Sequence, residues 1–180
     1  MRYLVVSDIH GDLAGVKTAL QALDIHGLTE ILCPGDVLYH GPRNDLPEHY
    51  APKEVIPLLN ARADHITAVR GNCDAEVDQM VLSFSVSEDY RVLSLNERTV
   101  YLTHGHVYGP DHLPPMQEGD ILLYGHTHIP RADRKDGIFL LNPGSISLPK
   151  EGHPNSYGIL SDDGFAVYGE DHTEYMEIAF

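Results

Sequence analysis

Five short segments of the chain carry aspartate, asparagine and histidine, which are side chains that bind divalent metal ions in proteins. In chain order they read Asp8-Ile9-His10, Gly35-Asp36, Gly71-Asn72, His104-Gly105-His106 and Gly125-His126-Thr127-His128. A mixture of carboxylate, amide and imidazole ligands suits Mn²⁺, Fe²⁺ or Zn²⁺ better than Mg²⁺. These residue types therefore indicate a metal site, if the fold brings the five segments together.

Each segment taken alone also has an ordinary interpretation. Asp8 and His10 could be a capping aspartate and an exposed histidine, and Gly-Asp and Gly-Asn pairs are common in turns. In an extended chain, however, residues two apart point the same way, so Asp8 and His10 can face one ion. His126 and His128 have the same spacing, and a glycine precedes them. The presence of all five segments, each at the end of a predicted strand, favours one shared site.

The surrounding residues predict an α/β fold that would position these segments. Apolar runs predict strands at 2–7, 30–36, 65–71, 98–106, 120–128, 137–145, 156–164 and 165–169, and helical spacing predicts helices at 13–23, 53–63 and 75–82. The first half alternates strands with helices and the second half is more antiparallel in character, which suggests two packed mixed sheets flanked by helices. Strand carboxyl ends are where α/β folds place their sites.

Length and charge limit the classes of function. The 180 residues, with no linker or repeat, predict a single domain over 1–180. Twelve basic against 27 acidic residues give a net charge of −15, which disfavours a nucleic-acid partner. A small anionic substrate would need a local positive centre, and a bound metal supplies one. No apolar run reaches the roughly 18 residues of a membrane span, so we expect no membrane partner and a cytoplasmic location.

The five segments, in this order, resemble the motifs of the calcineurin-like metallophosphoesterase superfamily. The family pattern is D-x-H, G-D, G-N-H-[ED], H and G-H-x-H, and this chain reads "SDIHG", "PGD", "RGNCD", "LTHGH" and "YGHTH". The loop "GDVLYHGPRNDLPEHYAP" and the later "FLLNPGS" resemble the small bacterial YfcE-like phosphodiesterase group. The resemblance implies a four-layer αββα sandwich. It also implies two divalent ions, with Mn²⁺ as the first expectation and Zn²⁺, Fe²⁺ or Ni²⁺ as alternatives.

The resemblance also assigns the ligands and the reaction. The first ion would take Asp8, His10, Asp36 and His128, and the second would take Asp36, Asn72, His104 and His126. Asp36 would be shared, because a carboxylate has an oxygen for each ion. A hydroxide bridging the two ions would attack the phosphorus of a small phosphodiester, with no covalent enzyme intermediate.

Cys73 is the one departure from the family pattern, because most members carry histidine at this position. A thiol has an ordinary pKa of about 8.5 against about 6.5 for imidazole, and Asp74 next to it would favour the neutral thiol. We therefore predict a weak general acid at Cys73, with preference for diesters whose leaving group departs unaided. Cys73 could equally be a small residue near the site. A covalent cysteine phosphatase is disfavoured, since "CDAEVDQM" offers acids where such enzymes need a phosphate-cradling loop with a nearby arginine.

Further predictions concern residues around the ligands. His40 and Arg43 lie in the loop after Asp36 and are candidates to contact substrate, although Arg43 could instead anchor the loop. His106 could orient the ring of His104, and Cys33 lies in an apolar run that predicts a core position.

Two other classes of function stay open. The same motifs occur in phosphomonoesterases, nucleotidases and nucleases, and a retromer subunit that resembles this family is a scaffold that has lost ligands. All seven expected ligands are present here, which favours an enzyme acting on small phosphodiesters. A homo-oligomer is left open by the sequence.

Overall fold

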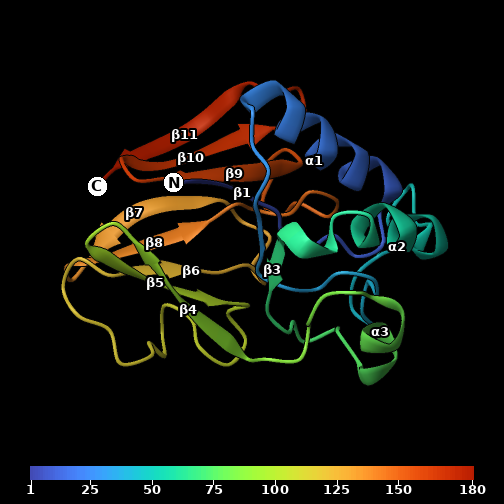
Figure 1. Ribbon diagram of the computed structural model, residues 1–180, viewed down its shortest axis with the longest axis horizontal. Helices are drawn as coiled ribbons and strands as arrows, with labels where there is room; N and C mark the ends of the chain where they lie inside the picture. The colour runs from blue at the N-terminus through green and yellow to red at the C-terminus, as the bar shows by residue number, and fades with distance from the viewer.

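The computed structural model describes residues 1–180, and its strands form two mixed sheets (Figure 1). The first sheet has the order β11-β10-β9-β1-β2-β3, with β1 (Arg2–Val5), β2 (Ile31–Cys33), β3 (Ile66–Ala68), β9 (Ser156–Ser161), β10 (Gly164–Gly169) and β11 (Glu174–Ala179). The second has the order β4-β5-β6-β8-β7, with β4 (Tyr90–Leu95), β5 (Arg98–Thr103), β6 (Ile121–Leu123), β7 (Arg131–Lys135) and β8 (Ile138–Asn142). The predicted pair of mixed sheets is confirmed.

Each sheet contains three strands that run parallel to one another. In the first sheet β1, β2 and β3 are parallel, and β9 joins β1 in the antiparallel sense. In the second sheet β5, β6 and β8 are parallel, with β4 and β7 antiparallel at the edges. The second half of the chain therefore contributes a parallel centre as well as the antiparallel strands that the sequence suggested.

Helices α1 (Leu13–His26), α2 (Pro52–Asn60) and α3 (Glu76–Val81) gather at the right of Figure 1, and the second sheet lies at the lower left. The side chain of Asp12 caps α1 by accepting a 2.6 Å hydrogen bond from the amide of Gly15. The helix ends at Gly27, whose φ of 62° is left-handed. The buried face of α1 carries Val16, Ala19 and Leu23. None of the helices combines the length and hydropathy needed to cross a bilayer.

The core has two main parts. A cluster of 21 buried residues fills the space between the helices and the first sheet, and it includes Cys33, as predicted. A second cluster of 13 residues lies between the two sheets, with Leu32 and Leu160 on one side and Leu123 and Leu141 on the other. These apolar layers hold the two sheets in a fixed relation, so that loops at the ends of both can meet.

Three strands, β4, β7 and β11, were missed by the sequence analysis. All three are edge strands, and each exposes much of its surface to solvent. An edge strand has few buried positions, so its sequence lacks the apolar run by which central strands such as β6 are recognised.

Candidate metal centre

The predicted ligands all follow strands that run parallel in the two sheets. Asp8 and His10 come after β1, Asp36 after β2, Asn72 after β3, His104 after β5, and His126 and His128 after β6. The carboxyl ends of the parallel strands in both sheets face a common region. Segments more than 100 residues apart in sequence therefore come into contact there. The predicted segments thus lie at strand ends in both sheets and come together in one region.

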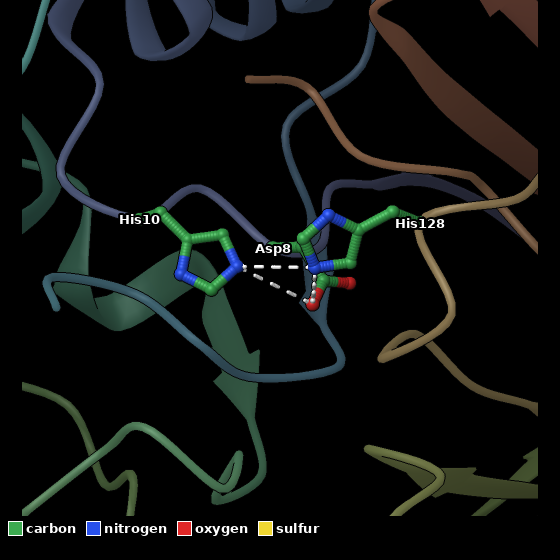
Figure 2. Close-up of side chains that lie close together, drawn as sticks. All are labelled: Asp8, His10 and His128. Atoms are coloured by element: carbon green, nitrogen blue, oxygen red, sulfur yellow. Dashed lines mark hydrogen bonds and ion pairs between the residues drawn. The ribbon is translucent and has the colours of Figure 1, made fainter. Parts of the chain in front are cut away.

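Asp8, His10 and His128 form one group of converging side chains, which Figure 2 shows pointing toward one another. His128 Nε2 lies 3.2 Å and His10 Nε2 lies 3.7 Å from the same oxygen, Oδ1 of Asp8. The Nε2 atoms of the two histidines are 3.2 Å apart. All three side chains are almost completely buried.

Asp36 connects this group with a second one. Its Oδ2 atom lies 3.8 Å from His10 Nε2 and 3.4 Å from His104 Nε2. Asn72 belongs to the second group, because its Oδ1 atom is 3.0 Å from His104 Nε2. The carboxylate of Asp36 therefore faces both groups, which is the position predicted for a ligand shared between two ions.

Backbone carbonyls fix the orientation of three of the four histidines. The Nδ1 atoms of His10, His104 and His128 lie 2.7, 2.8 and 2.5 Å from the carbonyl oxygens of Tyr39, Pro34 and Leu148, respectively. A neutral imidazole that donates from Nδ1 carries its lone pair on Nε2, the atom that points into the site.

The orientation of His104 differs from the prediction. His106 was expected to position this ring, but the carbonyl of Pro34 does so, and the His106 ring instead packs against His104 edge to face, with centroids 5.3 Å apart. A backbone carbonyl is a partner that no side-chain pattern could have indicated.

Two observations test whether these residues fit a divalent ion. Asp8 Oδ1 is buried and has no hydrogen-bond partner, which is costly for a carboxylate oxygen. With both Nδ1 atoms donating to carbonyls, the lone pairs of His10 and His128 face each other at 3.2 Å. A cation among these atoms would satisfy the orphaned oxygen and remove the repulsion between the lone pairs. The donor set thus fits a metal ion.

Electrostatics in this region follows from burial and from the close opposite charges. Burial opposes charge on His104, but the hydrogen bond that its ring donates to Asp36 and the charges of Asp8 and Asp36 outweigh it and raise the pKa of His104 to about 9. Burial raises the pKa of the Asp8 and Asp36 carboxyls, but the histidines beside them, chiefly His128 for Asp8 and His104 for Asp36, outweigh it and lower both pKa values. Burial and the charge of His104 lower the pKa of His126 to about 4. Both carboxylates are therefore ionised and ready to bind a cation at neutral pH.

The backbone at the ligands is unusual, because five of the seven have left-handed φ values. These are 53° for Asp8, 49° for His10, 57° for Asp36, 66° for His126 and 58° for His128. The expected extended conformation of Asp8-Ile9-His10 is therefore wrong. The left-handed backbone at these residues, and not the alternation of side chains along a strand, directs Asp8 and His10 toward one another. Such conformations cost free energy in residues other than glycine and concentrate at functional sites.

Asp74 was predicted to act beside Cys73 in catalysis, and in the structure its carboxylate faces backbone amides. Its carboxylate accepts hydrogen bonds of 2.7 to 2.8 Å from the N–H groups of Gly71, Asp36 and Val37. Burial raises its pKa to about 6. The geometry makes Asp74 the residue that joins the loop after β3 to the loop carrying Asp36.

Gly71 is needed here for a different reason from the turn that the sequence suggested. A Cβ atom at this position would lie 2.0 Å from Asp36 Oδ1 and 2.4 Å from the Asp36 amide nitrogen. The absence of a side chain therefore lets the Asn72 loop approach Asp36.

Cys73 is half-buried beside Asp36. Its backbone amide donates a 2.8 Å hydrogen bond to Asp36 Oδ1, and its sulfur is within hydrogen-bonding reach of the Asn72 amide nitrogen at 3.2 Å. Burial and the charge of Asp36, with a smaller contribution from Asp74, raise the pKa of the Cys73 thiol to about 12. The thiol stays neutral at physiological pH, in the direction predicted.

A cavity of about 400 Å³ opens beside this centre. Its walls include the predicted ligands Asp36, Asn72, His126 and His128. They also include Arg43, as predicted for a rim residue, together with Asn44, Thr127 and Lys150. None of these wall residues is hydrophobic.

The cavity wall differs from the sequence predictions at two positions. His40 is absent from the cavity wall, and its ring packs edge to face between Tyr39 and Tyr50. Lys150 is in the wall but was missed, because it lies 22 residues after His128, outside every recognised segment. The only indication in the sequence is that basic residues are few, so each one is a candidate to bind an anionic substrate.

Comparisons with known proteins agree with this geometry. A family model described as the calcineurin-like phosphoesterase superfamily domain matches residues 1–164. The chain is 47% identical over 167 residues to Phosphodiesterase YfcE of Escherichia coli strain K12, covering 93% of this chain and 91% of that protein. The solved structure of Yfce, described as a phosphoesterase from E. coli, matches with a TM-score of 0.97 at 44% identity over 99% of both chains.

A more distant match concerns the fold alone. Wild-type Vps29 from Entamoeba histolytica, solved in complex with zinc, has a TM-score of 0.62 at 21% identity over 99% of both chains. The family model and the 47% identity together cover most of the sequence, including every predicted ligand. The chain therefore belongs to the calcineurin-like phosphoesterase superfamily.

Proposed function

We propose that this protein hydrolyses small phosphodiesters with the help of two divalent metal ions. The observation that carries the proposal is the position of Asp36, whose Oδ2 atom lies within 4 Å of histidines from both ligand groups. The name of the E. coli relative, a phosphodiesterase, supports the same type of substrate. The cavity of about 400 Å³ is of a size that suits a small molecule.

The two ions would be held as the motif resemblance implies. Asp8, His10 and His128 would bind one ion, Asn72, His104 and His126 the other, and Asp36 both. When bound, such a pair polarises phosphoryl oxygens and acidifies a water molecule enough for it to act as a nucleophile near neutral pH. The imidazole and amide ligands favour Mn²⁺, Fe²⁺ or Zn²⁺, and we propose Mn²⁺ first.

The remaining residues orient the ligands and the substrate. The carbonyls of Tyr39, Pro34 and Leu148 hold the imidazoles with their Nε2 atoms inward. Asp74 holds the backbone of Asp36 in place. The neutral thiol of Cys73 would protonate a leaving oxygen poorly, because its pKa of about 12 leaves little driving force for proton transfer at pH 7. We therefore expect the best substrates to be diesters with good leaving groups.

One experiment separates this function from its rivals. The protein is stripped of metal and reloaded separately with Mn²⁺, Mg²⁺, Zn²⁺ or Fe²⁺, and hydrolysis of an aryl phosphodiester is compared with that of the matching monoester. We expect Mn²⁺ to give the highest rate and the diester to be the better substrate. Preference for the monoester would support a phosphomonoesterase instead, and absence of hydrolysis with every metal would support a scaffold on the same fold.

A further inference from the structure

Two cations stand in the cavity wall in addition to the metal ligands. They are Arg43, from the loop after β2, and Lys150, from the segment after β8. We propose that these two side chains form an anion subsite that selects phosphodiesters whose alcohol arm carries a second negative group, such as a carboxylate or a phosphate. This inference rests on the proposed function, because it names the class of diester that the site accepts.

Neither cation is neutralised by the protein itself. Four of the twelve basic residues lie within 4 Å of a carboxylate oxygen, namely Arg70, Arg91, Arg131 and Arg134, and the other eight form no ion pair. Among these eight, Arg43 and Lys150 are the two that line the cavity. Arg43 and Lys150 have no carboxylate within 4 Å, although acidic residues outnumber basic ones by 27 to 12. In so acidic a chain, two unpaired cations in one cavity are available for an anion from solution.

The segment that carries Lys150 is tied to the metal centre by its backbone. The amide of Lys150 donates to the carbonyl of His128 at 3.3 Å, and the carbonyl of Leu148 receives Nδ1 of the same histidine at 2.5 Å. The hydroxyl of Ser147 donates to the carbonyl of Asp8 at 2.9 Å. The backbone at Lys150 is therefore fixed relative to the proposed ligands Asp8 and His128.

The loop that carries Arg43 is held by contacts with residues that neighbour the predicted ligands in sequence and by contacts within the loop. Gly41 packs against the Cys73 sulfur, since a Cβ atom there would lie 2.8 Å from it. The side-chain amide of Asn44 closes the loop by donating to the carbonyl of His40 at 2.7 Å. Farther along, the amide of His49 donates to the Asp12 carboxylate at 3.2 Å. Arg43 thus reaches the cavity from a braced segment.

The chemistry of the wall identifies the part of the substrate that these cations contact. The two proposed metal ions already balance the negative charge of the phosphoryl group that reacts. Arg43 and Lys150 are therefore available to bind a second negative group on the substrate. The wall has no hydrophobic residue on which an aromatic arm could pack, so the natural arm is polar. Arginine offers a planar fork of donors and lysine a single ammonium group, and both bind carboxylate or phosphate.

Binding of two matched compounds tests the subsite without requiring turnover. Benzyl(3-carboxypropyl)phosphinic acid and benzyl(3-carbamoylpropyl)phosphinic acid carry P–C bonds in place of both ester bonds, so they cannot be hydrolysed, and they differ by one charge in the arm. Their dissociation constants are measured by calorimetry with the Mn²⁺-loaded protein and with Arg43→Gln, Lys150→Gln and the double variant. Lys135→Gln is the matched control, because it removes one exposed, unpaired positive charge that is not in the cavity wall. Lys135 pairs with Ile138 at the start of β8, the end of that strand away from the metal centre.

We expect the carboxylate compound to bind about tenfold more tightly than the amide compound, with each cation contributing about threefold, as for exposed ion pairs. In each single variant the preference for the carboxylate compound should fall about threefold. The double variant should show no preference, and Lys135→Gln should keep the full preference. Equal binding of the two compounds by the unmodified protein would overturn the subsite. So would equal weakening of both compounds in the variants, since the cations would then hold the reacting phosphoryl group.

Hydrolysis of an aryl diester is measured on the same preparations. If the protein keeps its binding preference but hydrolyses no diester, the proposed function fails while the anion subsite stands. If it hydrolyses diesters without preference for the charged arm, the subsite fails while the function stands.

Discussion

At the scale of single residues, Cys73 has the clearest consequence for catalysis. It lies beside Asp36, the proposed shared ligand, and its thiol is held neutral by burial and by that carboxylate. We predict that Cys73→His raises turnover of phosphate monoesters relative to aryl diesters by at least about tenfold, because imidazole is a better general acid near neutral pH. The measurement is the ratio of kcat values for a matched monoester and diester.

Cys73→Ser is the matched control, since a hydroxyl is also a poor acid and should leave the ratio close to that of the unmodified protein. The imidazole is larger than the thiol that Gly41 packs against, so KM is measured separately to detect a shift of this loop. An unchanged ratio in Cys73→His would show that Cys73 is only a small residue near the site.

A second residue-scale prediction concerns Gly71. A methyl group at this position would overlap Asp36 Oδ1 and the Asp36 backbone, so Gly71→Ala must displace Asp36, the proposed shared ligand. We expect at least a tenfold loss of metal affinity, measured by titration with Mn²⁺. Gly169→Ala is a control, because its φ is not left-handed and the nearest atom to its Cβ would belong to the Asp171 side chain, at 3.0 Å. Normal Mn²⁺ affinity in Gly71→Ala would contradict the described approach of the two loops.

At the scale of elements, the strands explain which parts of the fold the sequence could reveal. Central strands such as β6 and β8 are buried along their whole length and read as apolar runs. The edge strands β4, β7 and β11 alternate or expose polar side chains, so they resemble loops in sequence. The order of strands in each sheet depends on contacts between distant segments, and a single sequence carries little information on these.

The candidate site also has features that the sequence could predict and features that it could not. Its ligands could be predicted because they lie in short segments at the ends of recognisable strands. Their left-handed backbone, the carbonyl partners of the histidines and the contribution of Lys150 could not, since each depends on atoms brought together only by folding.

The layer between the sheets should determine stability at this scale. Leu123 of β6 is completely buried there, whereas Val92 on the edge strand β4 is 52% exposed. We predict that Leu123→Ala lowers the free energy of unfolding by about 2–5 kcal/mol through lost burial and a cavity. Val92→Ala should cost less than about 1 kcal/mol. Urea unfolding of both variants checks this, and equal losses would contradict the assigned packing.

At the scale of the whole molecule, the buried charges of the centre link stability to pH. The pKa of His104 is raised from 6.5 to about 9 in the folded, metal-free protein. Because the folded protein binds this proton more tightly than the unfolded chain does, the protonated imidazole stabilises the fold fully below pH 6.5. This contribution to stability disappears as pH rises through about 9. We predict that the metal-free protein loses up to about 3 kcal/mol of stability between pH 6.5 and 9.5. Chemical denaturation in the presence of a chelator measures this.

The variant His104→Asn should lack most of this decline. The affinity for Mn²⁺ should change in the opposite direction, because the metal needs the neutral imidazole and competes with the proton. A metal-free protein whose stability is flat or rises over this range would mean that His104 does not hold a proton in the folded state.

The central claim is that seven side chains from both sheets hold two ions, with Asp36 between them. The most direct test is the metal content per chain after reloading with Mn²⁺, measured by elemental analysis together with hydrolysis of an aryl diester. We predict two ions for the unmodified protein, and for Asp36→Asn the loss of at least one ion and of hydrolysis. One ion in the unmodified protein, or two ions with full hydrolysis in Asp36→Asn, would contradict the account.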